Sequence, residues 1–257
     1  MQKLIRTITT GDLNEKIEIA SSLINEPVSP ILKLTDTELF KIPGRPAGFQ
    51  ITHPRSVPKR NFRDSKNRSH FLHAIANIEL LAIELPALCL LRFGSNNESF
   101  IKRQFQIIAE EAKHFSLLKD RLHDLGCEFG SVPVHIGLWD YAWRCKSELE
   151  HQIIIPCYLE ARGLDVTPDF IKKFNEVEDP ESAAIMQIIL NEEVHHVKMG
   201  IEYMEQIAEV QNTTASKLYE KTLKNFFGDK IKSKIPINRH YRKLAGFNDE
   251  QISMIED

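Results

Sequence analysis

Apolar residues recur at helical spacing over four long stretches, and this pattern restricts the fold more than any other feature. The stretches cover residues 69–93, 98–125, 137–162 and 180–210, and a glycine follows each of the first three as a typical helix-ending residue. At 1.5 Å per residue, a helix of about 25 residues is roughly 37 Å long, the length found in four-helix bundles. No stretch alternates apolar and polar residues for long enough to require a sheet. The sequence therefore predicts an all-α fold.

The chain on either side of these stretches has a different character. A helix is predicted over residues 13–26, because the preceding Asp12 is a favoured N-cap residue. Six prolines between residues 27 and 58 exclude long helices there and predict an extended wrap over the domain surface. Short helices are predicted at residues 213–227, 238–245 and 248–256. We therefore expect three parts: an N-terminal helix and extended wrap (1–68), a four-helix bundle (69–211) and a C-terminal helical extension (212–257).

The composition of the 257 residues is that of a soluble globular protein, with 27% charged residues and a net charge of −3. No segment has 18 uninterrupted apolar residues, so no membrane span and no membrane partner are expected. The N-terminus lacks the apolar core of a secretory signal. The four cysteines form no C-x-x-C pair, which fits reduced thiols. We expect a cytoplasmic protein.

Glutamate and histidine three residues apart lie on one face of a helix, where both can reach the same metal ion. About one such pair is expected by chance in a chain of this composition, and this sequence contains four. They are Glu111/His114, Glu148/His151, Glu192/His195 and Glu193/His196. A dinuclear carboxylate site in a helix bundle takes Glu-x-x-His from each of two helices and a single Glu from each of the other two.

The single glutamates are available in the first and third stretches, as Glu79 and Glu160. Glu79 precedes Glu111 by 32 residues, and Glu160 precedes Glu193 by 33 residues. One unit, a helix with Glu followed by a helix with Glu-x-x-His, is thus repeated at nearly equal spacing. This repetition predicts a metal site built from two half-sites.

Helical phase separates some of the alternatives. Glu111 falls in a row of core-type residues, whereas Glu110 falls among polar and charged residues and is interpreted as solvent-exposed. His151 lies nine residues before Glu160, about half a turn away around the helix, so its pair is interpreted as a chance occurrence. Phase does not distinguish between the two overlapping pairs of the fourth stretch.

The donor set indicates which metal to expect. Four glutamates and two neutral imidazoles form a hard oxygen-and-nitrogen shell that suits iron, with manganese as the alternative. A single buried Glu–His pair is more often a simple hydrogen-bonded pair. Four buried carboxylates without counter-charges would be costly, however, and two divalent cations would neutralise them.

Six motifs between residues 43 and 200 carry a resemblance to a known family. They are PGRPA (43–47), HAIANIE (73–79), AEEAKHF (109–115), GLW (137–139), LEARGLDVTP (159–168) and EEVHH (192–196). The chain resembles an uncharacterised bacterial ferritin-like family, a domain of unknown function, within the ferritin-like superfamily of carboxylate-bridged di-iron proteins. The resemblance implies a ferritin-like four-helix bundle with additions at both ends, and no substrate. A more distant similarity is to the ferritin-like tRNA-modifying hydroxylase.

The same resemblance implies a ligand set. The motif of the fourth stretch is similar to a family motif that ends in a single histidine, which aligns with His196 and places His195 behind or outside the metal ligands. The implied ligands of the two metal ions are Glu79, Glu111, His114, Glu160, Glu193 and His196.

Three functions fit these features. The first is a di-iron or Fe/Mn carboxylate oxidoreductase that activates O2 to hydroxylate or oxidise an unknown substrate, either a small molecule or a nucleotide-linked one, with an electron donor as partner. The second is a ferroxidase or iron-handling protein. The third is a metal-containing binding protein whose basic segments, residues 52–68 and 217–246, receive RNA or another anionic partner. Nucleic acid is the least favoured partner, because no aromatic-interleaved motif accompanies the basic residues. The oligomeric state is left open.

Several other residues are interpreted as structural. His73 is interpreted as structural and not as a ligand, and Trp139 and Trp143, four residues apart, are expected in the core. Glu84, five residues after Glu79, could lie near the metal site but is interpreted as an ordinary helix charge. Pro86 and Pro156 fall inside long helical stretches and are expected to kink them.

Overall fold

The computed structural model describes residues 1–35, 40–57, 62 and 64–256. Within these residues the protein is helical, and no strand forms beyond two isolated bridge pairs, Ile31–Ser95 and Ile51–Val134. The all-α prediction is therefore confirmed. Three of the basic residues in the first predicted basic segment, Lys59, Arg60 and Arg63, lie outside the described residues.

The chain divides into two compact units, Met1–Trp143 and Arg144–Asp257. The division into an N-terminal part, a bundle and a C-terminal extension stays a prediction.

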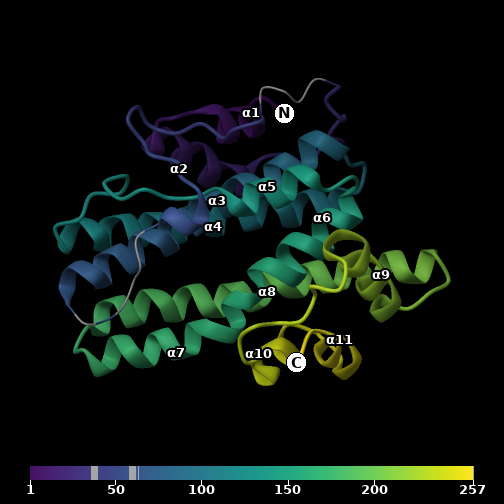
Figure 1. Cartoon of the computed structure of the whole chain (residues 1–257). Coiled ribbons are helices and arrows are strands. Elements are labelled where there is room, and N and C mark those ends of the chain that lie inside the picture. Colours follow the sequence, from purple (N-terminus) through teal and green to yellow (C-terminus); the bar gives the residue numbers. More distant parts are fainter. Residues whose placement is uncertain (36–39, 58–61, 63, 257) are drawn as a thin grey trace. The chain divides into compact units, whose positions relative to one another are not determined.

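The first unit is built around two long helices, α3 (Ser65–Phe93) and α4 (Glu98–Asp124), which pack against each other. The shorter α1 (Gln2–Thr9) packs on α3, and α2 (Leu13–Ser22) packs on α4 (Figure 1). The remaining elements are the 3-10 turns η1 (Leu23–Asn25) and η3 (Pro54–Ser56) and the helix α5 (Gly137–Arg144). This arrangement buries most of α3.

Local sequence signals set the ends of α3 and α4. The Asp64 side chain accepts a hydrogen bond from the backbone N–H of Asn67, so α3 begins four residues before the predicted Ser69. Gly94 ends the helix, as predicted, with a φ of 70°. A Cβ at this position would lie 2.8 Å from the backbone nitrogen of Lys33, so only glycine fits. The helix α1 was not predicted, because Met1 offers no side-chain cap.

By length and composition, α3 could cross a membrane, but 89% of its most apolar window is buried inside the protein. The core helix of a soluble protein has the same properties, so α3 is weak evidence for a membrane span. The cytoplasmic location stays a prediction.

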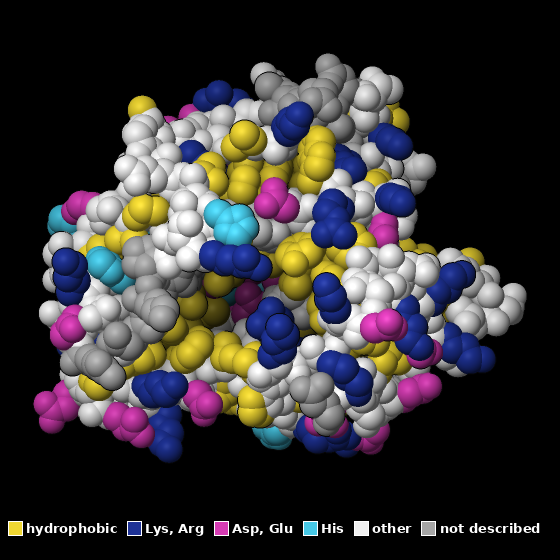
Figure 2. Space-filling model, in the orientation of Figure 1, with side chains coloured by type: hydrophobic (Ala, Val, Ile, Leu, Met, Phe, Trp, Pro, Cys, Tyr) yellow, Lys and Arg dark blue, Asp and Glu magenta, His cyan; other side chains and the backbone are white. Residues whose placement is uncertain are grey.

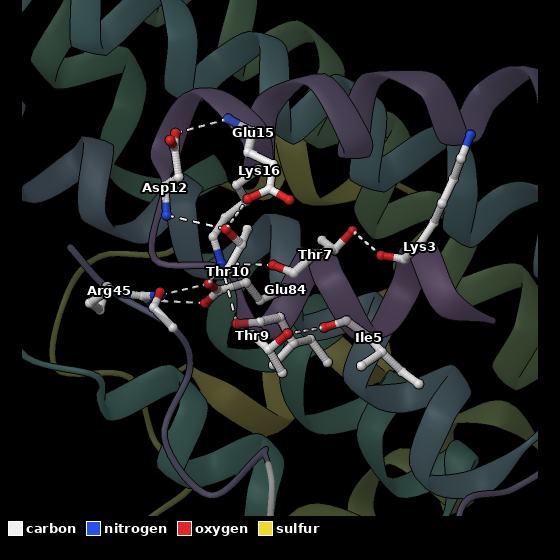
Figure 3. Close-up of polar contacts among 12 residues, drawn as sticks. Lys3, Ile5, Thr7, Thr9, Thr10, Asp12, Glu15, Lys16, Arg45 and Glu84 are labelled. Atoms are coloured by element: carbon white, nitrogen blue, oxygen red, sulfur yellow. Dashed lines mark hydrogen bonds and ion pairs between the residues drawn. The ribbon is translucent and has the colours of Figure 1, made fainter.

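A buried cluster of charges joins three parts of the first unit (Figure 3). The ammonium group of Lys16 on α2 donates to Glu84 Oε1 on α3 at 2.5 Å, and to the backbone carbonyls of Thr7 and Ile8 at 2.7 and 3.3 Å. Arg45 donates to both oxygens of Glu84, at 2.5 and 2.9 Å. The side chains of Lys16 and Glu84 are 0% exposed, and that of Arg45 is 5% exposed. The interpretation of Glu84 as an ordinary helix charge is therefore wrong.

The second unit contains α6 (Glu148–Ile154), the π-helical turn η4 (Ile155–Glu160), α7 (Arg162–Glu176) and α8 (Pro180–Val210). Its C-terminal part adds α9 (Ala215–Phe227), α10 (Arg239–Leu244) and α11 (Asp249–Ile255) (Figure 1). The three C-terminal helices match the prediction, because Thr214, Asn238 and Asn248 each cap one of them.

The prediction of a third long helix over residues 137–162 is wrong. The helix stops after Arg144, and the Ser147 hydroxyl accepts a hydrogen bond from the N–H of Glu150 to begin a new helix, α6. Gly163 was expected to end a helix, but its φ is not positive, and α7 continues through Pro168. The distortion expected at Pro156 takes the form of the turn η4, whereas Pro86 lies inside α3 without ending it.

Candidate metal centre

Three of the predicted ligands meet in the first unit, where α3 supplies Glu79 and α4 supplies Glu111 and His114. Each side chain offers a donor atom within 4.8 Å of the others. The imidazole Nδ1 of His114 lies 3.2 Å from Oε2 of Glu79 and 3.2 Å from Oε2 of Glu111. The three residues are between 0% and 3% exposed. Two carboxylates and one imidazole therefore share a single buried position between two packed helices.

Burial and the contacts among the three side chains determine the protonation of this cluster. Burial raises the pKa of Glu79 to about 8, and the neighbouring Glu111 carboxylate adds to the effect. Burial alone would lower the pKa of His114, but the hydrogen bonds with Glu111 and Glu79 outweigh it and raise the pKa to about 11. At neutral pH the metal-free cluster thus holds protons on Glu79 and His114. A metal ion would have to displace them.

We expect the metal-free protein to become less stable as the pH rises from about 6.5 to about 8. The folded state keeps its protons on Glu79 and His114 through this range, whereas an unfolded chain, with ordinary pKa values of 4.5 and 6.5, has released or is releasing them. The state that binds more protons loses stability as the pH rises. Urea unfolding in EDTA at a series of pH values measures the trend.

The control for this pH prediction is a Glu79→Gln protein, whose amide cannot titrate, and which should show a shallower decrease. The decrease should also vanish when divalent metal is present, because the metal takes the place of the protons. A metal-free protein that gains stability between pH 6.5 and pH 8 would contradict the prediction.

The second unit carries the other three predicted ligands. Glu193 and His196 lie on α8, with His196 Nδ1 3.9 Å from Glu193 Oε2. His196 is buried and the side chain of Glu193 is 13% exposed, whereas the neighbouring His195 faces solvent. Glu160 is half-buried and is the last residue of the turn η4, which packs against α8.

The residues that the sequence analysis did not take as metal ligands have other hydrogen-bond partners. Glu110 is half-buried, and its carboxylate accepts a hydrogen bond from Gln106 on the polar face of α4. The carboxylate of Glu148, from the pair interpreted as chance, accepts a hydrogen bond from the Tyr203 hydroxyl at 2.5 Å. His73 and Trp139 are buried as expected, whereas Trp143, also expected in the core, is half-buried. His73 accepts from the N–H of Gly130 at 2.8 Å, and the Trp139 indole donates to the carbonyl of Lys41 at 3.2 Å.

Sequence reasoning missed a second buried ion pair, in the second unit. The Arg242 guanidinium donates to both carboxylate oxygens of Asp165, at 3.1 and 2.6 Å. Both residues are less than 10% exposed. Asp165 lies in the motif LEARGLDVTP. Its place in a family motif was the sequence feature that could have drawn attention to it. Its partner is 77 residues away, beyond the reach of helical spacing.

Ion pairs also occupy much of the predicted basic segment 217–246, which carries nine basic residues. Lys224 pairs with Glu220, Arg239 with Asp249 and Glu256, and Lys243 with Asp249. Figure 2 shows basic and acidic side chains interspersed over the C-terminal helices. The segment is therefore less cationic in the folded protein than its sequence suggests.

The fold and the cluster of Glu79, Glu111 and His114 define an all-helical protein with a buried carboxylate–histidine group that could hold a metal ion. The chain belongs to the family described as "Protein of unknown function (DUF455)", whose sequence profile matches residues 9–253. An uncharacterized protein of Haemophilus influenzae is 30% identical over 271 aligned positions, which cover 99% of this chain and 92% of the relative. No solved structure matches the chain significantly. The resemblance to an uncharacterised family is thus confirmed, without a function.

Proposed function

We propose that this protein is a ferritin-like dinuclear metal oxidoreductase that activates O2 to hydroxylate or oxidise an organic substrate. The observation that carries the proposal is the buried cluster of Glu79, Glu111 and His114, with donor atoms within 4.8 Å of one another. Paired carboxylates in a nearly solvent-free position resist ionisation, as the raised pKa of Glu79 indicates. A divalent cation removes that penalty.

The donor set suits the proposed metals. Carboxylate oxygens and imidazole nitrogens bind iron and manganese, and no thiolate is required. In the first unit, Glu79 and Glu111 would supply negative charge, and the Nδ1 of His114 that faces them would supply the nitrogen ligand. Iron is the first choice and manganese the alternative.

The second half of the proposed site comes from Glu160, Glu193 and His196. Two overlapping pairs compete on α8, and the buried position of His196, against the exposed position of His195, supports the register Glu193/His196. The repeat of Glu79 with Glu111, at 32 residues, and of Glu160 with Glu193, at 33 residues, supports a site of two equivalent halves.

The proposed reaction fixes what else the protein needs. Insertion of one oxygen atom into a C–H bond consumes one O2, two electrons and two protons, and releases one water. Iron held by these glutamates and histidines would supply the reducing equivalents for O2. An electron donor must therefore restore them, and the polypeptide's part is to hold the ligands and to exclude bulk water.

The experiment that tests this function is metal analysis followed by oxygen measurement. Protein loaded with Fe2+ without air should bind two ions per chain and consume O2 when air is admitted. Protein that binds fewer than two ions, or that binds two and consumes no O2, would contradict the proposal. Oxidised iron that accumulates beyond two ions per chain would instead indicate a ferroxidase or iron-handling protein.

A further inference from the structure

The turn η4 is the one π-helical segment among the described residues, and it ends at Glu160. Within it the N–H of Ala161 donates to the carbonyl of Pro156, five residues earlier, at 3.0 Å. A π-turn adds one residue to a helix and turns every later residue by about 100° around the axis. The direction of the Glu160 carboxylate therefore depends on whether this turn forms.

Two buried side chains from the C-terminal helices bind the backbone of the turn. The Tyr219 hydroxyl on α9 donates to the carbonyl of Cys157 at 3.2 Å, and Arg242 on α10 donates to the same carbonyl at 3.5 Å. Tyr219 and Arg242 are 0% and 1% exposed. Burial raises the pKa of Tyr219, so its hydroxyl keeps the proton that it donates. A helix distorted in this way needs partners from outside for its carbonyl groups.

Asp165 fixes the orientation of Arg242. It accepts two hydrogen bonds from the guanidinium, and its Oδ1 also accepts from the backbone N–H of Asn238, the cap of α10, at 3.0 Å. The guanidinium carbon lies 5.0 Å from the centre of the Phe247 ring. A buried ion pair contributes little net stability, so its value here is the fixed direction of the arginine.

The opposite side of the turn rests on α8 at Gly200. A Cβ at Gly200 would lie 2.8 Å from the Cys157 sulfur and 3.2 Å from Pro156 Cγ. Gly200 is one helical turn after His196. The turn is therefore held between the helix that carries Glu193 and His196 and the side chains of the C-terminal helices.

We propose that Tyr219 and Arg242, the latter oriented by Asp165, are positioning residues that hold the π-turn and thereby aim Glu160 at the metal site. This inference rests on the proposed function, because it takes Glu160 as a metal ligand. It assigns a role to the C-terminal helices: they fix the form of a helical distortion that Pro156 introduces.

The test is a Co2+ titration followed by visible absorption, with the melting temperature of the metal-free protein measured in EDTA. Tyr219→Phe keeps the ring and removes one hydrogen bond to the turn, and Arg242→Lys removes the two-bond contact with Asp165. Both should weaken Co2+ binding by about 10-fold to 100-fold, as for other residues that orient metal ligands. The matched control, Tyr241→Phe, removes a hydroxyl next to Arg242 and should bind like the wild type.

The outcomes separate this inference from the proposed function. If the wild type binds two Co2+ ions and Tyr219→Phe binds them with unchanged affinity, the positioning role is wrong and the proposed function stands. The same holds if Tyr219→Phe lowers the melting temperature only. If Glu160→Gln still binds two ions with wild-type affinity, Glu160 is not a ligand and the inference fails. A wild type that binds no Co2+ would overturn both.

Discussion

A Glu111→Ala protein is expected to bind divalent metal at least about 100-fold more weakly than the wild type. Residues that merely orient a metal ligand are worth 10-fold to 100-fold in affinity, and Glu111 would be a ligand itself. Its carboxylate lies beside the carboxylate of Glu79 and the imidazole of His114 in one buried cluster. In the cluster of the first unit, removal leaves one carboxylate and one imidazole, which are too few to hold an ion tightly. Equilibrium dialysis against Mn2+ or anaerobic Fe2+ measures the loss.

The neighbouring residue provides the control. Glu110 has the same side chain on the same helix, but its carboxylate bonds to Gln106 on the polar face. Glu110→Ala changes the net charge by the same amount and should leave metal affinity unchanged. Equal losses in the two variants would show that long-range charge, and not coordination by the buried face, governs binding.

Much of the fold could be predicted because its signals are local. Asp12 and Asp179 cap α2 and α8, and Gly94 ends α3, where the sequence places them. The predicted third helix failed where the chain leaves α5 at Arg144 and begins α6 after Ser147. A distortion at Pro156 was expected, but its form as the turn η4 depends on distant contacts. The turn η4 is bound by Tyr219 and Arg242, 62 and 85 residues beyond Cys157. No helical periodicity contains that information.

The same distinction explains what could be predicted of the site. Glu111 and His114 are three residues apart on one face, and the phase of α4 separated Glu111 from Glu110. Glu84 has no such local signal, since its partners Lys16 and Arg45 are 68 and 39 residues away. Its burial follows from tertiary packing alone. Sequence analysis therefore predicts that a charged residue on a helix is solvent-exposed, unless a buried partner is known.

Replacing Glu84 with alanine is expected to destabilise the first unit by about 3–5 kcal/mol, the usual cost of removing one partner of a buried ion pair. The substitution leaves Lys16 and Arg45 buried without their shared carboxylate. At roughly 2–4 °C per kcal/mol, the melting temperature should fall on the order of 6–20 °C. Thermal unfolding followed by circular dichroism at 222 nm measures it.

The pH dependence of this loss identifies its cause. Burial lowers the pKa of Lys16, and Glu84 opposes that effect. Without Glu84 the ammonium group should release its proton more readily, so the deficit should shrink as the pH rises toward 10. Glu15→Ala is the control: Glu15 pairs with Arg6 at the surface, beside the same cluster (Figure 3), where solvent screens the interaction. If Glu84→Ala is no less stable than Glu15→Ala, the buried cluster does not hold α2, Arg45 and α3 together.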